Sequence, residues 1–302
     1  MLAREGRSTK TSKKLLAAIL VLVAGILAAG CGGGSPESRG LALGIATGWD
    51  ESAVVSNLSK ILLEEELGYG EVRLQELELG PVIQGVASGD LDAYQDIWLP
   101  NHQQQINEVR NDIVQLEPWY LGTTEFGIAV PYYMEIQTIP ELNQTSVDRI
   151  LGIEPGAVIS ERIPESVIPT YDLEQDYVES STPSMLSEVD RLYNDQQPFA
   201  FVAWRPHWMN ARYDFRYLAD PQDALGDLND GATISTIVNE DLPDNDPVAY
   251  AFLGALRLTE EQVNEIENIN PSDYAQSART WLENNRDVVE PWLEAARNAQ
   301  EA

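Results

Sequence analysis

Two short segments of the chain carry nearly the same arrangement of tryptophan, proline and histidine. Residues 98–102 read Trp-Leu-Pro-Asn-His, and residues 204–208 read Trp-Arg-Pro-His-Trp. Each segment follows an apolar run, 91–97 or 199–203, that is typical of a buried strand. Because proline is favoured in the first turn of a helix, we expect each tryptophan where a strand ends and a helix begins. Indole faces are the usual protein contact for a quaternary ammonium group, and two of them from separate parts of the chain would suit such a ligand.

The elements that would position these segments follow the alternating pattern of an α/β protein. We predict strands at 41–47, 72–77, 91–97, 113–116, 125–130, 150–153, 199–203, 215–218 and 232–238, with helices at 52–67 and 81–87 and a helical end at 245–299. In open α/β sheets, ligands bind beyond the carboxyl ends of the strands. This order favours two lobes with two crossings between them and a ligand cleft where they meet. We expect residues 41–125 plus 225–302 in lobe 1 and residues 126–224 in lobe 2.

The first forty residues predict an exported protein. Five basic residues precede the apolar run 15–29, which ends at Gly30 and Cys31, the only cysteine of the chain. This pattern is typical of a secretory signal and is short for a membrane span. A cysteine after small residues resembles a bacterial lipoprotein processing site, although an ordinary signal peptide with an incidental cysteine is the alternative. We expect residues 1–30 to be a lipoprotein signal peptide, Cys31 to be lipidated, and residues 31–40 to be a Gly/Ser tether, so that a lipid anchor alone holds the protein at an extracytoplasmic membrane face.

The charge of the chain is strongly acidic, with 19 basic and 49 acidic residues. Residues 1–30 hold five of the basic residues and one acidic residue, so the remainder has 14 against 48 and a formal charge of −34. Such a surface argues against nucleic-acid binding, which needs positive charge. Only Lys60 remains after Lys14, and acidic, lysine-poor surfaces are typical of salt-adapted proteins because high salt screens their self-repulsion. An ordinary acidic secreted protein is the alternative.

The sequence offers little support for an enzyme. It has no Gly-x-Ser-x-Gly elbow and no His-Glu-x-x-His motif, and its two histidines, over a hundred residues apart, make poor zinc ligands. We therefore expect no cofactor and no metal. Carboxylate pairs arise by coincidence in so acidic a chain, so an exported hydrolase that uses paired carboxylates stays open as an alternative.

Several motifs, in their order along the chain, together resemble a known family. They are residues 48–52 (Gly-Trp-Asp-Glu-Ser), 62–69, 85–92, 98–102, 152–157, 178–181 and 203–209. The chain resembles the substrate-binding proteins of glycine betaine, proline betaine and choline ABC transporters, the OpuAC/ProX-like family, from about residue 41 to about residue 295. The resemblance implies a two-lobed type II periplasmic-binding-protein fold with a hinge and an interlobe ligand cleft.

The ligand site that this resemblance implies is an aromatic box around a trimethylammonium group. Its walls would be Trp49, Trp98 and Trp204. Similar proteins place a histidine just after the Trp-x-Pro motif, so His102 is the expected donor to a ligand carboxylate. Backbone N–H groups at a helix start near Gly156 are a second candidate, because helix N-termini bind anions. Choline-binding relatives tend to carry asparagine where Ala157 stands, which favours a betaine here.

Three polar residues beside these segments have competing interpretations. Asp50 and Glu51 could neutralise a cation or orient their loop, but solvated loop charges are the commoner outcome. His207 more often caps a helix or packs than binds a ligand.

The resemblance implies a protein that passes glycine betaine or a similar compatible solute to an ABC permease and ATPase for osmoprotection. Choline or carnitine uptake, and a binding lobe that signals to a receptor, are the alternatives.

Overall fold

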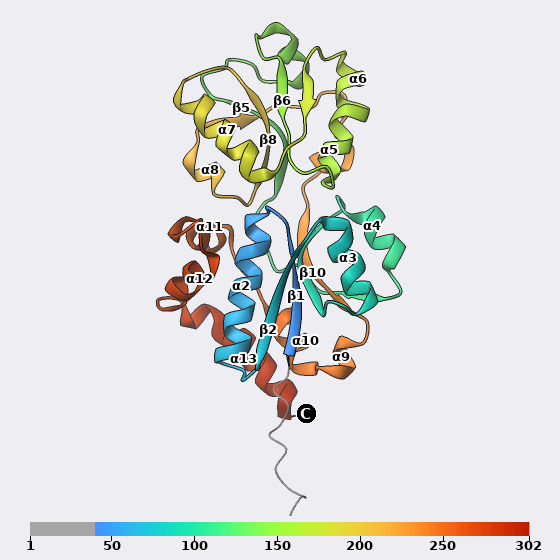
Figure 1. Cartoon of the computed structure of the whole chain (residues 1–302), viewed down its shortest axis with the longest axis vertical. Coiled ribbons are helices and arrows are strands. Elements are labelled where there is room, and N and C mark those ends of the chain that lie inside the picture. The colour runs from blue at the N-terminus through green and yellow to red at the C-terminus, as the bar shows by residue number, and fades with distance from the viewer. Residues whose placement is uncertain (1–39, 302) are drawn as a thin grey trace, which may run out of the picture. The chain divides into compact units, whose positions relative to one another are not determined.

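Two five-stranded mixed sheets form the framework of the protein. The computed structural model describes residues 40–301, so the predicted signal peptide, Cys31 and most of the tether lie outside the described residues. Both sheets belong to one compact unit, and helices pack against each of them (Figure 1). The predicted α/β class is confirmed.

The first sheet is built from the two ends of the described chain. Its strand order is β2 (Glu71–Leu77), β1 (Gly40–Ala46), β3 (Ala93–Leu99), β10 (Thr233–Asn239) and β4 (Ile113–Gln115). Strand β1 is parallel to β2 and β3, whereas β10 is antiparallel to β3 and β4. Alternate residues of β1 bury on opposite faces: Leu41 and Leu43 join one apolar cluster, and Ala42 and Ala46 join another. A sheet that is apolar on both faces requires helices on both.

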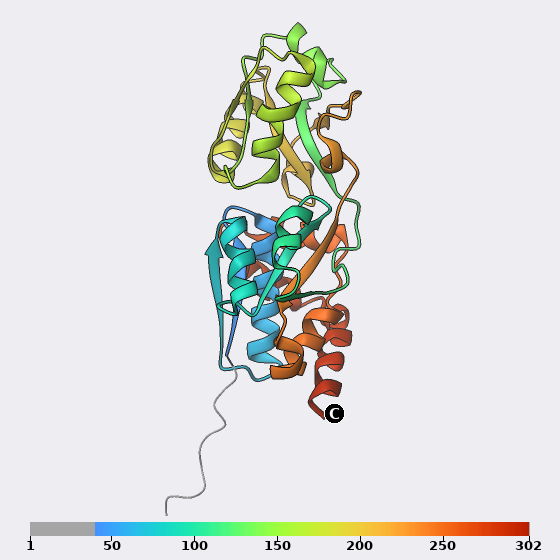
Figure 2. The same ribbon diagram turned by 90° about the vertical axis from the view of Figure 1, so that its right-hand side faces the viewer.

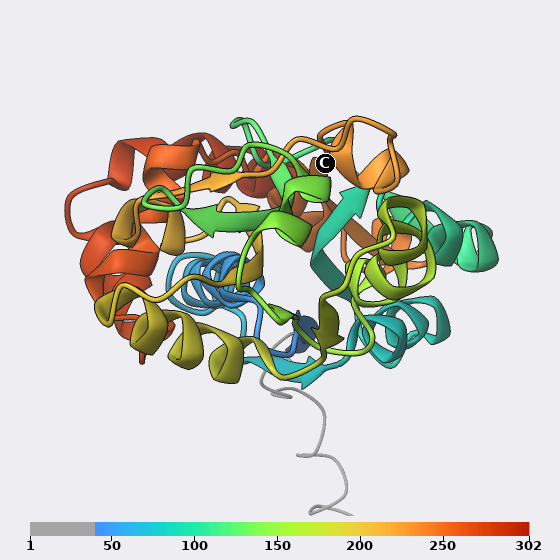
Figure 3. The same ribbon diagram turned by 90° about the horizontal axis from the view of Figure 1, so that it is seen from above.

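Helices cover both faces of this sheet. On the face of Leu41 and Leu43 lie α2 (Asp50–Glu65), α9 (Leu242–Asn245), α10 (Pro247–Ala255), α11 (Glu260–Ile269), α12 (Tyr274–Leu282) and α13 (Arg286–Glu301). On the other face lie α3 (Leu79–Ser88) and α4 (Gln103–Val109). Helix α13 packs against α10 (Figure 2). Figure 3 shows α11 and α12 (red) on one side of α2 (blue), with α3 and α4 (teal) on its other side.

The second sheet comes from the middle of the chain. Its strand order is β7 (Asp176–Val178), β6 (Arg149–Leu151), β8 (Ala200–Arg205), β5 (Glu125–Pro131) and β9 (Phe215–Tyr217). Strand β6 is parallel to β7 and β8, and β5 is antiparallel to β8 and β9. The helices of this part are the 3₁₀ turns η1 (Ile139–Gln144) and η3 (Gly226–Asn229), the π-helical turn η2 (Ile163–Val167), and α5 (Val158–Arg162), α6 (Ile168–Tyr171), α7 (Thr182–Asn194) and α8 (Met209–Arg212).

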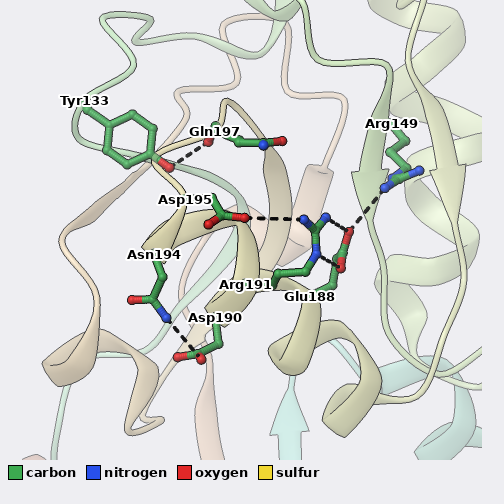
Figure 4. A network of polar contacts seen from close by, with 8 residues as sticks. All are labelled: Tyr133, Arg149, Glu188, Asp190, Arg191, Asn194, Asp195 and Gln197. Atoms are coloured by element: carbon green, nitrogen blue, oxygen red, sulfur yellow. Dashed lines mark hydrogen bonds and ion pairs between the residues drawn. The ribbon is translucent and has the colours of Figure 1, made fainter.

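The exposed face of α7 carries a network of ion pairs. Glu188 accepts hydrogen bonds from Arg191 of the same helix at 2.7 Å and from Arg149 of β6 at 3.3 Å (Figure 4). Arg191 also lies 3.7 Å from Asp195. Exposed pairs of this kind contribute at most about 1 kcal/mol each, so the network links α7 to β6 without dominating the stability of this part.

Two connections join the sheets, residues 116–124 between β4 and β5 and residues 218–232 between β9 and β10. They lie beside each other where the Thr124 hydroxyl donates to the Ala232 carbonyl at 2.8 Å. The predicted helical end 245–299 is confirmed and consists of four helices after α9. One predicted detail is wrong: the prolines of the Trp-x-Pro segments lie in turns, three residues before α4 and α8 begin.

None of the helices within residues 40–301 has both the length and the apolar character that crossing a membrane requires.

Candidate functional site

A small cavity brings together four of the residues that the sequence predicts for the site: Trp49, Trp98, His102 and Trp204. Its walls are Trp49, Glu51, Trp98, Asn101, His102, Phe126, Ile153 and Trp204. These residues belong to elements of both sheets and to the turns that follow them.

Trp98 is fixed at the end of β3 by its partners. Its backbone pairs with Ile234 of β10, and its indole Nε1–H donates to Asp96 Oδ1 at 2.8 Å. The strand extends two residues further than predicted because β10 pairs with it as far as Leu99. The indole is therefore held by a strand register and a buried carboxyl group, which leaves its orientation little freedom.

Trp204 occupies the matching place in the second sheet. In the β5–β8 pairing it lies opposite Phe126, and the two rings meet edge to face with centroids 6.4 Å apart. Phe126 also lies 6.2 Å from the Trp98 ring, so it stands between the two tryptophans. The sequence analysis missed Phe126, because its role follows from the register between two strands about eighty residues apart.

Trp49 is the residue that precedes helix α2, and its ring stacks on His102 at 5.8 Å with an interplanar angle of 22°. Gly48 before it has φ +78°, a left-handed conformation that favours glycine. A Cβ at this position would also lie 2.6 Å from Glu154 Oε1. The indole of Trp49 therefore depends on a glycine that lets the chain turn tightly beside the second sheet.

His102 is held as a neutral hydrogen-bond donor. Its Nδ1 accepts from the Trp98 backbone N–H at 3.1 Å, so Nε2 carries the ring hydrogen. Burial lowers the pKa of His102 to about 3, because a charged imidazolium would lose its hydration. A neutral Nε2–H donor beside three indoles can bind the negative end of a ligand without adding a charge to the cavity.

The predicted anion site near Gly156 is not part of this cavity. Gly156 is exposed, Ala157 is buried, and Ile153 is the residue of this segment that lines the cavity. The Ala157 N–H donates to the Glu154 carbonyl at 3.0 Å, and α5 is only five residues long. A ligand contact at Gly156 or Ala157 stays a prediction.

A polar contact joins α2 to the segment that follows β8. Asp50 Oδ2 accepts from Trp208 Nε1 at 2.6 Å and lies 3.3 Å from His207 Nε2. His207 is buried against the edge of the Trp204 ring, and its Nδ1 accepts from the Met209 N–H at 3.1 Å. Burial lowers the pKa of His207, with Asp50 opposing that shift. The interpretation of Asp50 as a solvated loop charge is wrong, because α2 begins at this residue and Asp50 has these two partners.

Three carboxyl groups in this part of the protein are buried: Glu51 of α2, which is itself a cavity wall, Asp96 of β3 and Glu267 of α11. Burial raises the pKa of each of them, that of Asp96 to about 8, and mutual repulsion raises the pKa of Glu51 and Glu267 further. The prediction of a solvated Glu51 is therefore wrong, since the first turn of α2 places it inside. Within residues 40–301, no group of three or more His, Cys, Asp or Glu side chains is arranged to hold a metal ion.

The sequence matches a known family over most of its length. Residues 42–284 match OpuAC, the substrate binding domain of ABC-type glycine betaine transport system. The glycine betaine/carnitine transport binding protein GbuC of Listeria monocytogenes is 31% identical over 178 residues, which are 57% of this chain and 55% of that protein. The chain thus spans about half the length of this relative.

Solved structures agree with this assignment. Lactococcal OpuAC, in its closed-liganded conformation with glycine betaine, has a TM-score of 0.76 and 26% identity, covering 84% of this chain and 99% of its own. An ABC-transporter choline binding protein in complex with choline has a TM-score of 0.76 and 24% identity, covering 88% of this chain and 99% of its own, and shows the shared fold. The predicted two-lobed periplasmic-binding-protein fold is confirmed.

The alternative of an exported hydrolase is set aside by the same match, because the family is a substrate-binding component of transporters. Such components work outside the cytoplasm. The match extends over residues 42–284, and the chain therefore belongs to the OpuAC family of ABC-transporter substrate-binding domains.

Proposed function

We propose that this protein captures glycine betaine or a similar quaternary-ammonium solute in the aromatic cavity and delivers it to the permease and ATPase of an ABC importer. The observation that carries the proposal is the meeting of Trp49, Trp98 and Trp204 around one cavity. A desolvated cation–π contact is worth about 2 kcal/mol, so three supply roughly 6 kcal/mol. A micromolar affinity corresponds to about 8 kcal/mol, and the remainder falls to the polar end of the ligand.

His102 is the proposed partner of a ligand carboxylate. Because Nδ1 accepts from the Trp98 N–H, Nε2–H is the donor that the neutral imidazole has left to offer, and His102 lines the cavity. Asn101, the neighbouring wall residue, offers an amide N–H as a second donor. A donor of this kind favours a betaine, whereas a choline hydroxyl needs an acceptor as well.

Choline or carnitine remains the second candidate ligand. The Listeria relative carries carnitine in its name, and one structure of this fold holds choline. Glu51 in the cavity wall would suit a ligand with a net positive charge or a hydroxyl group. Uptake of either compound would use the same aromatic walls.

The remaining parts of the chain complete this proposal. Residues 1–30 would be a lipoprotein signal peptide, Cys31 the lipidated residue and 31–40 the tether of a membrane-anchored protein. Lobe 1 would comprise 41–125 plus 225–302 and lobe 2 would comprise 126–224. The division is supported by the first sheet's strands, which come from residues 40–115 and 233–239, and by the second sheet's strands, which come from residues 125–217. The formal charge of −34 after residue 30 supports a salt-adapted protein for osmoprotection.

Titration calorimetry tests the ligand class. The purified protein is titrated with glycine betaine, proline betaine, carnitine and choline at low and high salt, with tryptophan fluorescence as a second signal. The proposal expects micromolar or tighter binding of at least one of these compounds, a change in tryptophan emission, and an unchanged compound after incubation. Absence of binding across the panel would refute it.

A further inference from the structure

Glu51 is a wall residue of the cavity that the aromatic box does not account for. Its side chain is 1% exposed and lines the cavity together with the three tryptophans. Its Oε2 is buried and has no hydrogen-bond partner among residues 40–301. An unpartnered buried carboxyl oxygen costs free energy, so this atom is suited to contact a group that enters the cavity.

The charged groups that act most strongly on Glu51 are acidic. They are Asp96 of β3, Glu267 of α11 and Asp50 of α2. Neutral polar groups near Glu51 lie on other elements: Tyr94 of β3, Tyr120 of the first connection, Tyr274 of α12, and His102, which lines the same cavity. His207 contacts Asp50, the residue before Glu51. No lysine or arginine is among the groups that act most strongly on Glu51, so none of these near groups would balance an ionised Glu51.

The two histidines do not supply that positive charge. Burial lowers the pKa of His102 to about 3 and also lowers that of His207. Both imidazoles are therefore neutral near pH 7. The missing positive charge must come from the ligand, or else the carboxyl group must keep its proton.

We propose that Glu51 responds to the net charge of the ligand, so that a cationic quaternary ammonium such as choline binds with release of the Glu51 proton to solvent, whereas a zwitterionic betaine binds without proton exchange. The inference rests on the proposed function and concerns the same cavity. The carboxyl O–H bond breaks, the proton passes to the buffer, and the carboxylate left behind balances the ammonium.

The physical basis is charge balance in a dry cavity. A nearby positive charge favours the ionised form of a carboxyl group, and a single unbalanced ion in such a place is costly. Choline brings one uncompensated positive charge. Betaine brings its own carboxylate, so ionising Glu51 would leave an extra negative charge beside Asp96 and Glu267. By linkage, one released proton makes choline affinity rise up to about tenfold per pH unit, while betaine affinity stays level.

The test is calorimetry of the whole protein with choline and with glycine betaine, in two buffers of different protonation enthalpy, at pH 6, 7 and 8. We expect about one proton released per choline and close to none per betaine. The dissociation constant for choline should fall roughly tenfold between pH 6 and pH 7, and that for betaine by less than about twofold.

Substitutions assign the proton to its residue. Glu51→Gln keeps the shape of the side chain and should abolish the proton release and weaken choline more than betaine. Glu51→Asp retains a carboxyl group and should keep the proton release. Glu71→Gln makes the same chemical change on the exposed first residue of β2 and should behave as the unmodified protein does.

Three results would overturn the inference while leaving the proposed function intact. They are equal proton counts for the two ligands, proton release that persists in Glu51→Gln, and betaine binding without any choline binding between pH 6 and pH 8. Failure of both ligands to bind would instead overturn the proposed function itself.

Discussion

At the scale of single residues, the site depends on side chains whose orientation is set by buried partners. Trp98 is oriented by Asp96, Trp49 by the ring of His102, and Trp204 by Phe126. Each of these partners is itself buried or half-buried. The indole faces are therefore arranged by the fold before a ligand arrives, and such preorganisation reduces the entropy cost of binding.

Replacing Trp98 or Trp204 by alanine should weaken betaine binding by more than about 1 kcal/mol, because each variant loses one desolvated cation–π face. The measurement is calorimetric affinity, with circular dichroism to show that the fold persists. Tyr132→Ala, which removes an aromatic ring that is 50% exposed, serves as the control and should bind normally. Wild-type affinity in both tryptophan variants would contradict the aromatic box.

Asp96 should make the stability of the ligand-free protein depend on pH. Burial raises the pKa of its carboxyl from 3.8 to about 8, so the folded state holds a proton that the unfolded state has lost between about pH 4 and pH 8. Its contribution to the free energy of unfolding therefore falls as pH rises through this window, by at most about 1.4 kcal/mol per pH unit.

Comparison with Asp96→Asn isolates this effect, because asparagine can still accept from the Trp98 indole but carries no titrating group. The melting temperature of the variant minus that of the parent protein should increase from pH 5 to pH 8. A difference that stays constant over this range would show that Asp96 does not hold a proton in the folded protein.

At the scale of elements, apolar runs predicted most strands, and the ends of those strands placed Trp49, Trp98 and Trp204 near one another. The apolar runs do not show which residues of two strands lie opposite each other. For that reason the place of Phe126 opposite Trp204 was missed. The start of α2 was predicted two residues late, which left Asp50 and Glu51 in a loop, although they form the first turn of the helix.

The helical end shows a signal that was present but not used. The Thr259 side chain accepts from the Gln262 N–H and Gln262 reaches back to Thr259, which starts α11, and Asp273 caps α12 in a similar way. A Thr-x-x-Gln capping box can be read from sequence. It would have divided the predicted segment 245–299 into separate helices.

The turn before α2 offers an element-scale test. Gly48→Ala should lower the free energy of unfolding by about 1 kcal/mol or more, because an alanine is strained at φ +78° and its Cβ would crowd Glu154. Gly254→Ala is the matched control: it lies inside α10 with nothing near its position, and alanine should stabilise the helix there by roughly 0.5–1 kcal/mol. Both values come from chemical denaturation, and equal effects at the two sites would contradict the account.

At the scale of the whole molecule, contacts between the two sheets' elements surround the cavity. Asp50 of α2 meets Trp208 and His207 after β8, and Arg205 of β8 lies 3.3 Å from Glu260 of α11. The first contact is largely buried, whereas both members of the second are about one-third exposed. The buried contact should therefore contribute more to holding the two parts together around a ligand.

Asp50→Ala should accelerate ligand dissociation about tenfold or more, since it removes a charge-assisted hydrogen bond worth roughly 1.5–3 kcal/mol. Stopped-flow tryptophan fluorescence measures this rate. Glu260→Ala breaks only the exposed pair and should change the rate by less than about threefold. Equal effects of the two variants would show that burial does not distinguish the contacts.

The most direct measurement of the central claim is a crystal structure of the protein with glycine betaine. The account predicts the methylated nitrogen within about 6 Å of the ring centroids of Trp49, Trp98 and Trp204, with the ligand carboxylate accepting from His102 Nε2. A betaine bound elsewhere, or one whose methyl groups contact fewer than two of these indoles, would contradict it.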